Sequence, residues 1–271
     1  MSASKTYIVS WDEVFNNTTQ IEAELIAGGF SYLVINKSKF LAQNDNWTKA
    51  KDTRYYGHFL TALEDFVDKK EHSIFIFHAG DCVWKEMSEY TKKLENIFKE
   101  NPSTGVVAPD QTNDPFTGPG SFIAKSELIP DLAVSTMTNG IFVALSRDIA
   151  EIIYKYMNWA LGKNINFYNM TSGWGLDYTY CGVAVYLNKC VYKDTSLTMA
   201  HPTGSGYNYA IADKEFRSVV GSFLEFWDNE GHDSKTLEKI FNLFIEKVQH
   251  GTKFQLSVED LYLNAKSKLA F

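Results

Sequence analysis

The chain of 271 residues is long enough for one large α/β domain with a helical appendage, and we expect one domain rather than two small ones. Its net charge of −7 and pI near 5.4 argue against a broad basic surface for nucleic acid or acidic lipid, but not against a local basic groove. Three cysteines without a CxxC pair, and an N-terminus without an apolar signal region, predict a reduced cytoplasmic protein. No apolar run approaches the ~20 residues that a membrane-spanning helix needs.

Strand and helix patterns alternate from the N-terminus. Residues 5–11 and 31–36 are predicted strands joined by a helix over 12–27, an order with which nucleotide-binding α/β domains commonly begin. The phosphate-binding pattern GxGxxG is missing, so an NAD-type site has no support. Residues 44–53 are a predicted loop in which Trp47 could stack on a base or pack in the core.

A predicted helix over residues 55–67 follows, and Arg54 and His58 lie near its start. Helix N-termini favour anions, so both residues are candidates for binding phosphate, although residues of these types are more often structural. Further along, the patterns predict a helix over 85–99, a buried strand over 105–109 and a long surface loop over 110–120.

The central strand is predicted over residues 73–77, where an apolar, β-branched and aromatic run stops at small and ionisable residues. Ligands of open α/β sheets bind just beyond the carboxyl ends of such strands. This places His78, Gly80 and Asp81 at a candidate site, where the Asp81 carboxylate could hold a hard divalent cation. Asp81 could equally cap the helix that follows.

Asn139 and Gly140 precede a predicted strand over 141–145 and a helix over 146–161. Both residues would let the backbone approach a ligand closely, and a plain turn is the alternative interpretation. Next, the sequence Gly-Trp-Gly-Leu-Asp ends at Asp177, just before a predicted helix over 178–187. An acid presented beside an aromatic wall is suited to accept a proton from a hydroxyl, whereas its structural alternative is an N-cap.

The last predicted strand, 191–198, leads to His201 and a glycine-rich stretch that ends at Tyr207. An imidazole followed by such a loop can provide a metal ligand and backbone amides for phosphate oxygens. The remaining predicted elements are three amphipathic helices, over 216–227, 234–249 and 257–268. We expect these helices to pack on the core or to form an oligomer contact.

Taken together, three stretches resemble the landmarks of GT-A-fold glycosyltransferases: an Asp at the end of a central strand, a Gly-Trp-Gly-Leu-Asp turn, and a late His before Gly-Ser-Gly-Tyr. The resemblance implies an α/β, GT-A-like single domain over 1–212, with a mostly parallel central sheet flanked by helices, and a helical C-terminal extension over 213–271. Where the family usually has Asp-x-Asp, this chain has His78-Ala-Gly-Asp81, so the first acid is missing.

The function implied by the resemblance is metal-dependent transfer of a sugar from a UDP- or GDP-type nucleotide-diphosphate sugar to a hydroxyl of a glycan acceptor. Asp81 and His201 would bind Mn²⁺ or Mg²⁺, and Asp177 would be the general base if the enzyme inverts, or a hydrogen-bonding residue if it retains. The residues expected to bind the donor are Ser10, Trp11, Asn36, Arg54, His58, His78, Gly80, Asp81, Gly204 and Tyr207. Those expected to bind the acceptor are Asn139, Gly140, Trp174 and Gly175.

Two alternatives stay open at this stage. Closely similar landmarks occur in phage enzymes that glycosylate hydroxymethylated pyrimidines in DNA, which would place the protein in the host cytoplasm rather than in a bacterium that encodes it. A basic cluster could serve such an acceptor, or could consist of solvated surface side chains; its members are Lys37, Lys39, Lys49, Lys51 and Arg54. Because the metal motif is incomplete, the chain could also be a non-catalytic protein that binds a nucleotide or a glycan.

Overall fold

A nine-stranded sheet runs through the computed structural model in the order β3-β2-β1-β4-β8-β5-β9-β7-β6. The structure describes residues 3–40, 42, 44–49, 54–82, 86–111, 122–125, 131–165, 167, 170, 173–200 and 208–250, and the side chains among them except those of 122–125, 209 and 245–250. The strands are β1 (Ser4–Ser10), β2 (Ser31–Asn36), β3 (Trp47–Lys49), β4 (Ile74–Ala79), β5 (Thr104–Gln111), β6 (Phe122–Lys125), β7 (Leu132–Ser135), β8 (Phe142–Ser146) and β9 (Cys190–Met199).

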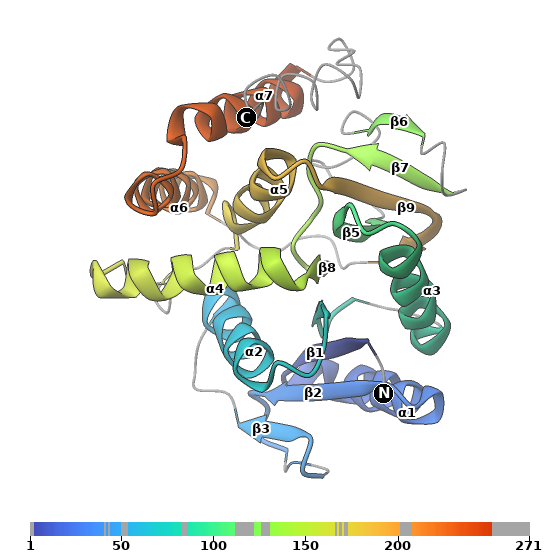
Figure 1. Ribbon diagram of the computed structural model, residues 1–271. Helices are drawn as coiled ribbons and strands as arrows, with labels where there is room; N and C mark the ends of the chain where they lie inside the picture. Colours follow the sequence, from blue (N-terminus) through green and yellow to red (C-terminus); the bar gives the residue numbers. More distant parts are fainter. Residues whose placement is uncertain are drawn as a thin grey trace.

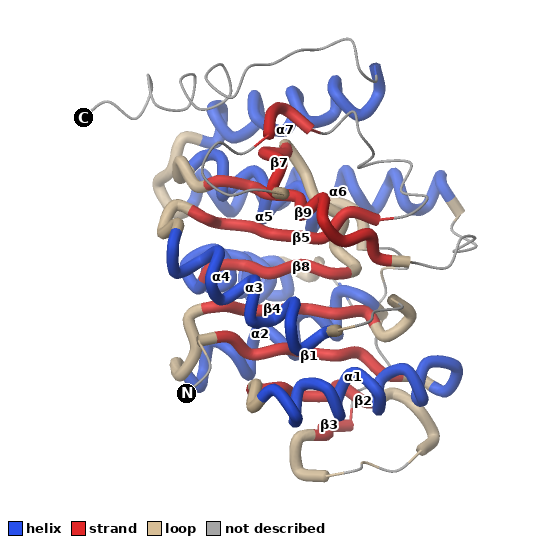
Figure 2. Tube along the Cα trace, turned by 90° about the vertical axis from the view of Figure 1, so that its right-hand side faces the viewer, coloured by secondary structure: helices blue, strands red, loops and turns tan. Residues whose placement is uncertain are grey.

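The helices of the described chain cover both faces of this sheet. They are η1 (Asp12–Val14, a 3₁₀ helix), α1 (Phe15–Gly28), α2 (Tyr55–Lys69), α3 (Met87–Glu100), α4 (Arg147–Gly162), α5 (Leu176–Tyr186), α6 (Tyr209–Asn229) and α7 (Ser234–His250). Figure 1 shows α1 and α3 on one side of the sheet and α2, α4, α5 and α6 on the other, and Figure 2 looks onto the face that α1 and α3 cover. No helix among the described residues is both long enough and apolar enough to span a membrane.

Strand direction follows from the pairing of neighbours. β1 pairs in parallel with β2 and β4, β2 with β3, and β5 with β9, whereas β8 runs antiparallel between β4 and β5. At the far edge β7 is antiparallel to β9 and to β6, so among the described strands only β7 and β8 are reversed. The predicted α/β class with a mostly parallel central sheet flanked by helices is therefore confirmed. The carboxyl ends of β1 to β5 and β9 meet at one edge.

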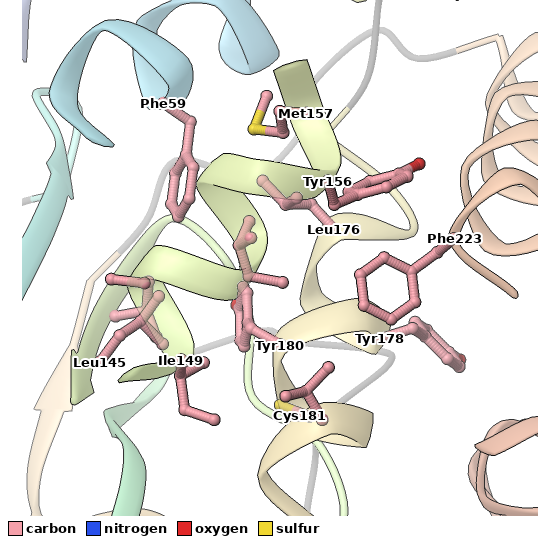
Figure 3. Close-up of a cluster of buried hydrophobic side chains, with 14 of the residues drawn as sticks. Phe59, Leu145, Ile149, Tyr156, Met157, Leu176, Tyr178, Tyr180, Cys181 and Phe223 are labelled. Atoms are coloured by element: carbon pink, nitrogen blue, oxygen red, sulfur yellow. The ribbon is translucent and has the colours of Figure 1, made fainter. Parts of the chain in front are cut away.

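Alternation along the strands divides the core into two layers. Tyr7 and Val9 of β1 belong to the larger layer, under α2, α4, α5, α6 and α7, whereas Ile8 faces the smaller layer under α1 and α3. Figure 3 shows part of the larger layer, where Tyr156 of α4 and Phe223 of α6 lie with 4.7 Å between their ring centroids. Because α6 and α7 share this core and α6 begins at Tyr209, the expected boundary at 212/213 falls inside a helix.

Several expected elements differ from those observed. The predicted loop over 44–53 contains the short edge strand β3, and the sequence analysis missed the antiparallel pair β6 and β7. Each of these strands has only three or four residues, too few for an alternating pattern to stand out. The predicted loop over 110–120 begins inside β5, and the rest of that loop and the predicted helix over 257–268 lie outside the described residues.

Trp47 is a structural residue and does not offer its ring to a base. It is 7% exposed, and its indole N–H donates to the carboxylate Oε1 of Glu22 over 2.7 Å. The same oxygen accepts hydrogen bonds from the Tyr32 hydroxyl at 2.9 Å and the Asn44 amide at 2.8 Å. Glu22 of α1 therefore fastens β3 and the segment before it to the rest of the domain.

Replacing Glu22 by Ala is expected to lower the free energy of unfolding by about 2 kcal/mol, because buried donors lose their acceptor and three hydrogen bonds disappear. Urea denaturation at neutral pH measures the change. The control is Glu13→Ala, which removes an exposed glutamate of η1. Equal denaturation midpoints for the two variants would contradict the role given to Glu22.

Candidate active site

The candidate site lies at the edge where the parallel strands end. β1 ends at Ser10, whose register partner on β2 is Asn36, and β4 ends at Ala79, whose partner on β1 is Val9. The reversed strand β8 starts at this same edge, because the Ala79 N–H donates to the Ile141 carbonyl over 2.8 Å. The turn of His78 to Asp81 and the turn of Asn139 and Gly140 are thus neighbours, although some 60 residues separate them in the chain.

His78 lies inside the core and not at the surface of this edge. Its side chain is fully buried, and its ring meets Phe142 edge to face with 5.4 Å between the centroids. Neither ring nitrogen has a hydrogen-bond partner among the described residues. Burial lowers the pKa of His78 to about 4, although the nearby Asp81 carboxylate acts in the opposite direction. The ring has no exposed surface in this structure, and the donor-binding role expected for His78 stays a prediction.

Gly80 is required by a contact with β1. A Cβ at this position would lie 2.1 Å from the carbonyl oxygen of Val9, so no other residue fits here without a shift of the backbone. The turn is also held by Asn17 of α1, whose side-chain amide donates to the carbonyls of Gly80 at 2.7 Å and Cys82 at 3.0 Å. Asp81 is the next residue after Gly80 in this turn, and its side chain is half-buried.

The other expected donor residues on the first strands differ in their exposure. Ser10 and His58 are buried, at 0% and 5% exposure, whereas Trp11 is half-buried and Arg54 is exposed. Asn36 is 6% exposed and shapes its own loop: its Oδ1 accepts from the N–H and hydroxyl of Ser38, and its Nδ2 donates to a backbone carbonyl. Ser10, His58 and Asn36 thus have little exposed surface, and the donor contacts expected of their side chains stay a prediction.

Tyr55 of α2 contacts two of the segments that are expected to bind the acceptor, at Gly140 and at Gly173. Its hydroxyl donates to the Gly140 carbonyl, and its ring lies so close to Gly173 that a Cβ there would be 2.6 Å from the ring. A Cβ on Gly140 would likewise be 2.6 Å from the Tyr55 hydroxyl and 3.4 Å from that of Tyr180. Gly140 is therefore small because two phenols crowd it, and its neighbour Asn139 uses Oδ1 to accept the Ile141 N–H at 3.1 Å.

Asp177 sits in the first turn of α5, where the helix dipole favours a negative charge. Its Oδ1 accepts the backbone N–H groups of Gly175 and Tyr178, both at 3.0 Å. Gly175 adopts φ +99°, which favours glycine, and a Cβ there would meet Val219 of α6 at 3.0 Å. The carbonyl of Trp174, a half-buried residue, accepts a hydrogen bond from the hydroxyl of Tyr56. Asp177 thus stands on a turn that protein contacts fix from several sides.

Exposed cations lie next to the ends of elements that meet at this edge. Lys37 follows β2, Lys49 ends β3, and Arg54 precedes α2, and all three are exposed. Lys39 is exposed as well and pairs with Asp12, with 3.3 Å between Nζ and Oδ2. Among the basic residues singled out from the sequence, only Lys51 lies outside the described residues.

The last predicted stretch of the site also lies outside the described residues: it contains His201, Gly204 and Tyr207. Strand β9 leads towards it, and the Cα partner of Met199 at the end of β9 is Gln111 at the end of β5. The chain therefore enters this stretch from the same edge. The described residues contain no group of three or more His, Cys, Asp or Glu side chains placed to hold a metal ion.

Sequence reasoning missed Asn17, Tyr55 and Tyr56 as residues of the site. Tyr56 fitted the buried side of an amphipathic helix, and its hydroxyl gave no local signal of a partner 118 residues away. Asn17 lies on α1, 63 residues before the carbonyl of Gly80 that it binds. The one available hint was that a helix begins with two adjacent tyrosines at the edge where the strands end.

No protein-family model and no curated protein matches the chain. Among solved structures, the chain is similar to A197 from STIV, with 14% sequence identity, coverage of 74% of this chain and 86% of that chain, and a TM-score of 0.42. It is also similar to residues 1–349 of S. aureus TarS, with 10% identity, coverage of 97% of this chain and 78% of that chain, and a TM-score of 0.49.

Proposed function

We propose that the protein is a glycosyltransferase that moves a sugar from a UDP- or GDP-type nucleotide-diphosphate sugar to a hydroxyl of a glycan acceptor. One observation carries the proposal: the turn that ends at Asp81 and the turn that ends at Asp177 lie at the same sheet edge. They are connected through Ile141, Gly140 and Tyr55 by named contacts. Two of the three sequence landmarks, those of Asp81 and Asp177, thus support the proposal by their proximity, and the third, at His201, lies outside the described residues.

Charge supports a donor with a diphosphate group. Arg54 at the start of α2, with Lys37 and Lys49 at the strand ends, would attract the phosphates and stabilise the negative charge that develops on the leaving diphosphate. Electrostatic stabilisation of this kind is strongest for charge that appears only in the transition state. Among the described residues, these three exposed cations are the ones that we assign to that task.

The donor set fits a divalent ion that a diphosphate holds jointly with the protein. Asp81 supplies one half-buried carboxylate at the edge, and His201 follows β9 in sequence. Mg²⁺ needs only one or two carboxylates beside substrate phosphates and water, so an incomplete acidic motif is compatible with Mg²⁺ or Mn²⁺. When bound, such an ion would neutralise charge on the leaving diphosphate.

Asp177 is assigned the role of general base towards the acceptor hydroxyl. Two backbone N–H groups orient its Oδ1, and the carboxylate would take the proton of the acceptor hydroxyl. This role applies to transfer with inversion at the anomeric carbon. In a retaining reaction the same carboxylate would hydrogen-bond the acceptor or the donor sugar.

The proposed function is tested by melting the protein with a series of nucleotide sugars, with and without Mn²⁺. A ligand that binds only the folded chain, at about 100 times its Kd, stabilises it by about 2.7 kcal/mol and raises Tm by roughly 5–10 °C. We expect one UDP- or GDP-linked sugar to give such a shift only with the metal. Asp81→Ala should abolish the shift, and absence of any shift with the wild-type chain would contradict the proposal.

DNA is the second candidate acceptor, because the exposed cations Lys37, Lys49 and Arg54 gather at one edge of an otherwise acidic protein. A DNA acceptor predicts that binding weakens steeply as salt rises, whereas a neutral glycan acceptor does not. Fluorescence anisotropy with a labelled duplex at several salt concentrations separates the two. Binding of a nucleotide sugar without its consumption, in the presence of either acceptor, would indicate a non-catalytic binding protein.

A further inference from the structure

The first turn of α2 makes two contacts with the segments expected to hold the acceptor. The Tyr55 hydroxyl donates to the Gly140 carbonyl, and the hydroxyl of its neighbour Tyr56 donates to the Trp174 carbonyl. Tyr56 is fully buried and stacks on Phe167 with 5.2 Å between the ring centroids. Two adjacent phenols of one helix thus hold segments that lie about 85 and 118 residues away.

The Tyr56 contact reaches Asp177 through a single peptide group. The Trp174 carbonyl that accepts the Tyr56 hydroxyl belongs to the same peptide unit as the Gly175 N–H, which donates to Asp177 Oδ1 at 3.0 Å. A peptide unit is planar, so fixing the direction of its C=O also fixes the direction of its N–H. Rotation of this one plane would break both hydrogen bonds together.

We propose that Tyr56 is a positioning residue for Asp177, acting through the Trp174–Gly175 peptide. The inference rests on the proposed function of Asp177 as the group that receives the acceptor proton. The hydrogen bond from Tyr56 is needed because of Gly175. A glycine at φ +99° lets its peptide units reorient more easily than any other residue would. The Tyr56 hydroxyl restricts rotation of the Trp174–Gly175 peptide and so keeps the Asp177 carboxylate in one orientation.

Two further observations fit this role. Burial, with a smaller contribution from nearby groups that include Asp177, raises the pKa of Tyr56 well above its usual range, so its hydroxyl stays protonated and able to donate. The hydroxyl that begins this series of hydrogen bonds lies in the core, whereas Trp174 and Asp177 are half-buried. The contact of Tyr55 with Gly140 and Gly173 steadies the same turn from its other side.

The test compares Tyr56→Phe with Tyr156→Phe, which removes another fully buried phenol that donates to a backbone carbonyl, that of Val219 at 2.9 Å. Both variants delete one oxygen, and because the Tyr156 hydroxyl also bonds Ser222 at 2.8 Å, Tyr156→Phe should lower Tm at least as much as Tyr56→Phe. Only Tyr56→Phe is expected to reduce kcat for transfer, by ~10- to 100-fold, because a displacement of about 1 Å at a reacting group has effects of this size. The KM for the donor should stay within a factor of about two, because the donor groups are unaffected.

Amide hydrogen exchange gives a readout that does not depend on activity. Peptides covering residues 173–178 should exchange faster in Tyr56→Phe than in the wild type and in Tyr156→Phe, because the reoriented peptide frees the Gly175 N–H. Unchanged exchange there, or equal loss of kcat in both variants, would overturn the role of Tyr56. A wild-type chain that transfers no sugar would instead overturn the proposed function, and the exchange comparison would still decide whether Tyr56 holds the turn.

Discussion

Replacing Asp177 by Asn is expected to reduce the rate of glycosyl transfer by roughly 10²- to 10⁴-fold, the range that one general base contributes. The amide keeps the size of the side chain, and its oxygen can still accept the Gly175 and Tyr178 N–H groups, so the turn should survive. It has no basic oxygen left for the acceptor proton. Steady-state transfer and donor hydrolysis, measured side by side, should show loss of the first and retention of the second.

Asp148→Asn provides the matched control. Asp148 also lies in the first turn of a helix, α4, where it accepts the Ser146 hydroxyl and pairs with Lys189 at 2.8 Å. It follows the reversed strand β8 and therefore stands at the opposite edge of the sheet. Its replacement should affect stability but not transfer. A transfer rate for Asp177→Asn within about tenfold of the wild type would contradict a general-base role.

The position of the site could be predicted from the sequence because the signals are local. The apolar run of β4 and the small and ionisable residues after it mark a strand end, and strand ends of α/β sheets gather at one edge. The turn before β8 came to the same edge because β8 is reversed and starts where β4 stops. Periodicity therefore indicates the elements and the end of β4, whereas the reversal of β8 that brings Asn139 and Gly140 to the same edge was not predicted.

The roles of single residues depended on partners far away in the sequence. Gly80 is glycine because of the Val9 carbonyl, and Gly175 because of its φ and of Val219. For Trp47, stacking on a base and packing in the core were both open from the sequence, and only the distant partner Glu22 decides for packing. A single sequence does not show which distant backbone lies next to a glycine. A glycine that leaves room for a ligand therefore cannot be told from one that leaves room for another part of the protein.

His78 shows a second difficulty of sequence-based prediction, which is to locate the last residue of a strand. The apolar run stops at Phe77, which suggested that His78 lies beyond the strand, but β4 extends to Ala79. The strand's alternation then places His78 on the same face as Ile74 and Ile76, in the layer under α1 and α3. Strand limits are the least certain part of a periodicity argument, and here an error of two residues moved an imidazole from the surface into the core.

The buried imidazole predicts how stability depends on pH. The pKa of His78 is about 4 in the folded chain and close to 6.5 when unfolded, so between these values the unfolded chain binds the proton and the folded chain does not. The free energy of unfolding therefore falls as pH decreases through this window and the contribution of His78 is fully present above it. A difference of about 2.5 pH units corresponds to a loss of about 3 kcal/mol by pH 4.

His78→Leu removes the titrating ring and both buried nitrogens, so it should flatten the pH dependence between 6.5 and 4 and make the variant more stable than the wild type at the acid end. Urea denaturation at half-unit pH intervals gives the two curves. His72→Leu, at a partly exposed position just before the same strand, is the control and should follow the wild-type curve. Parallel curves for His78→Leu and the wild type across the window would contradict the contribution assigned to His78.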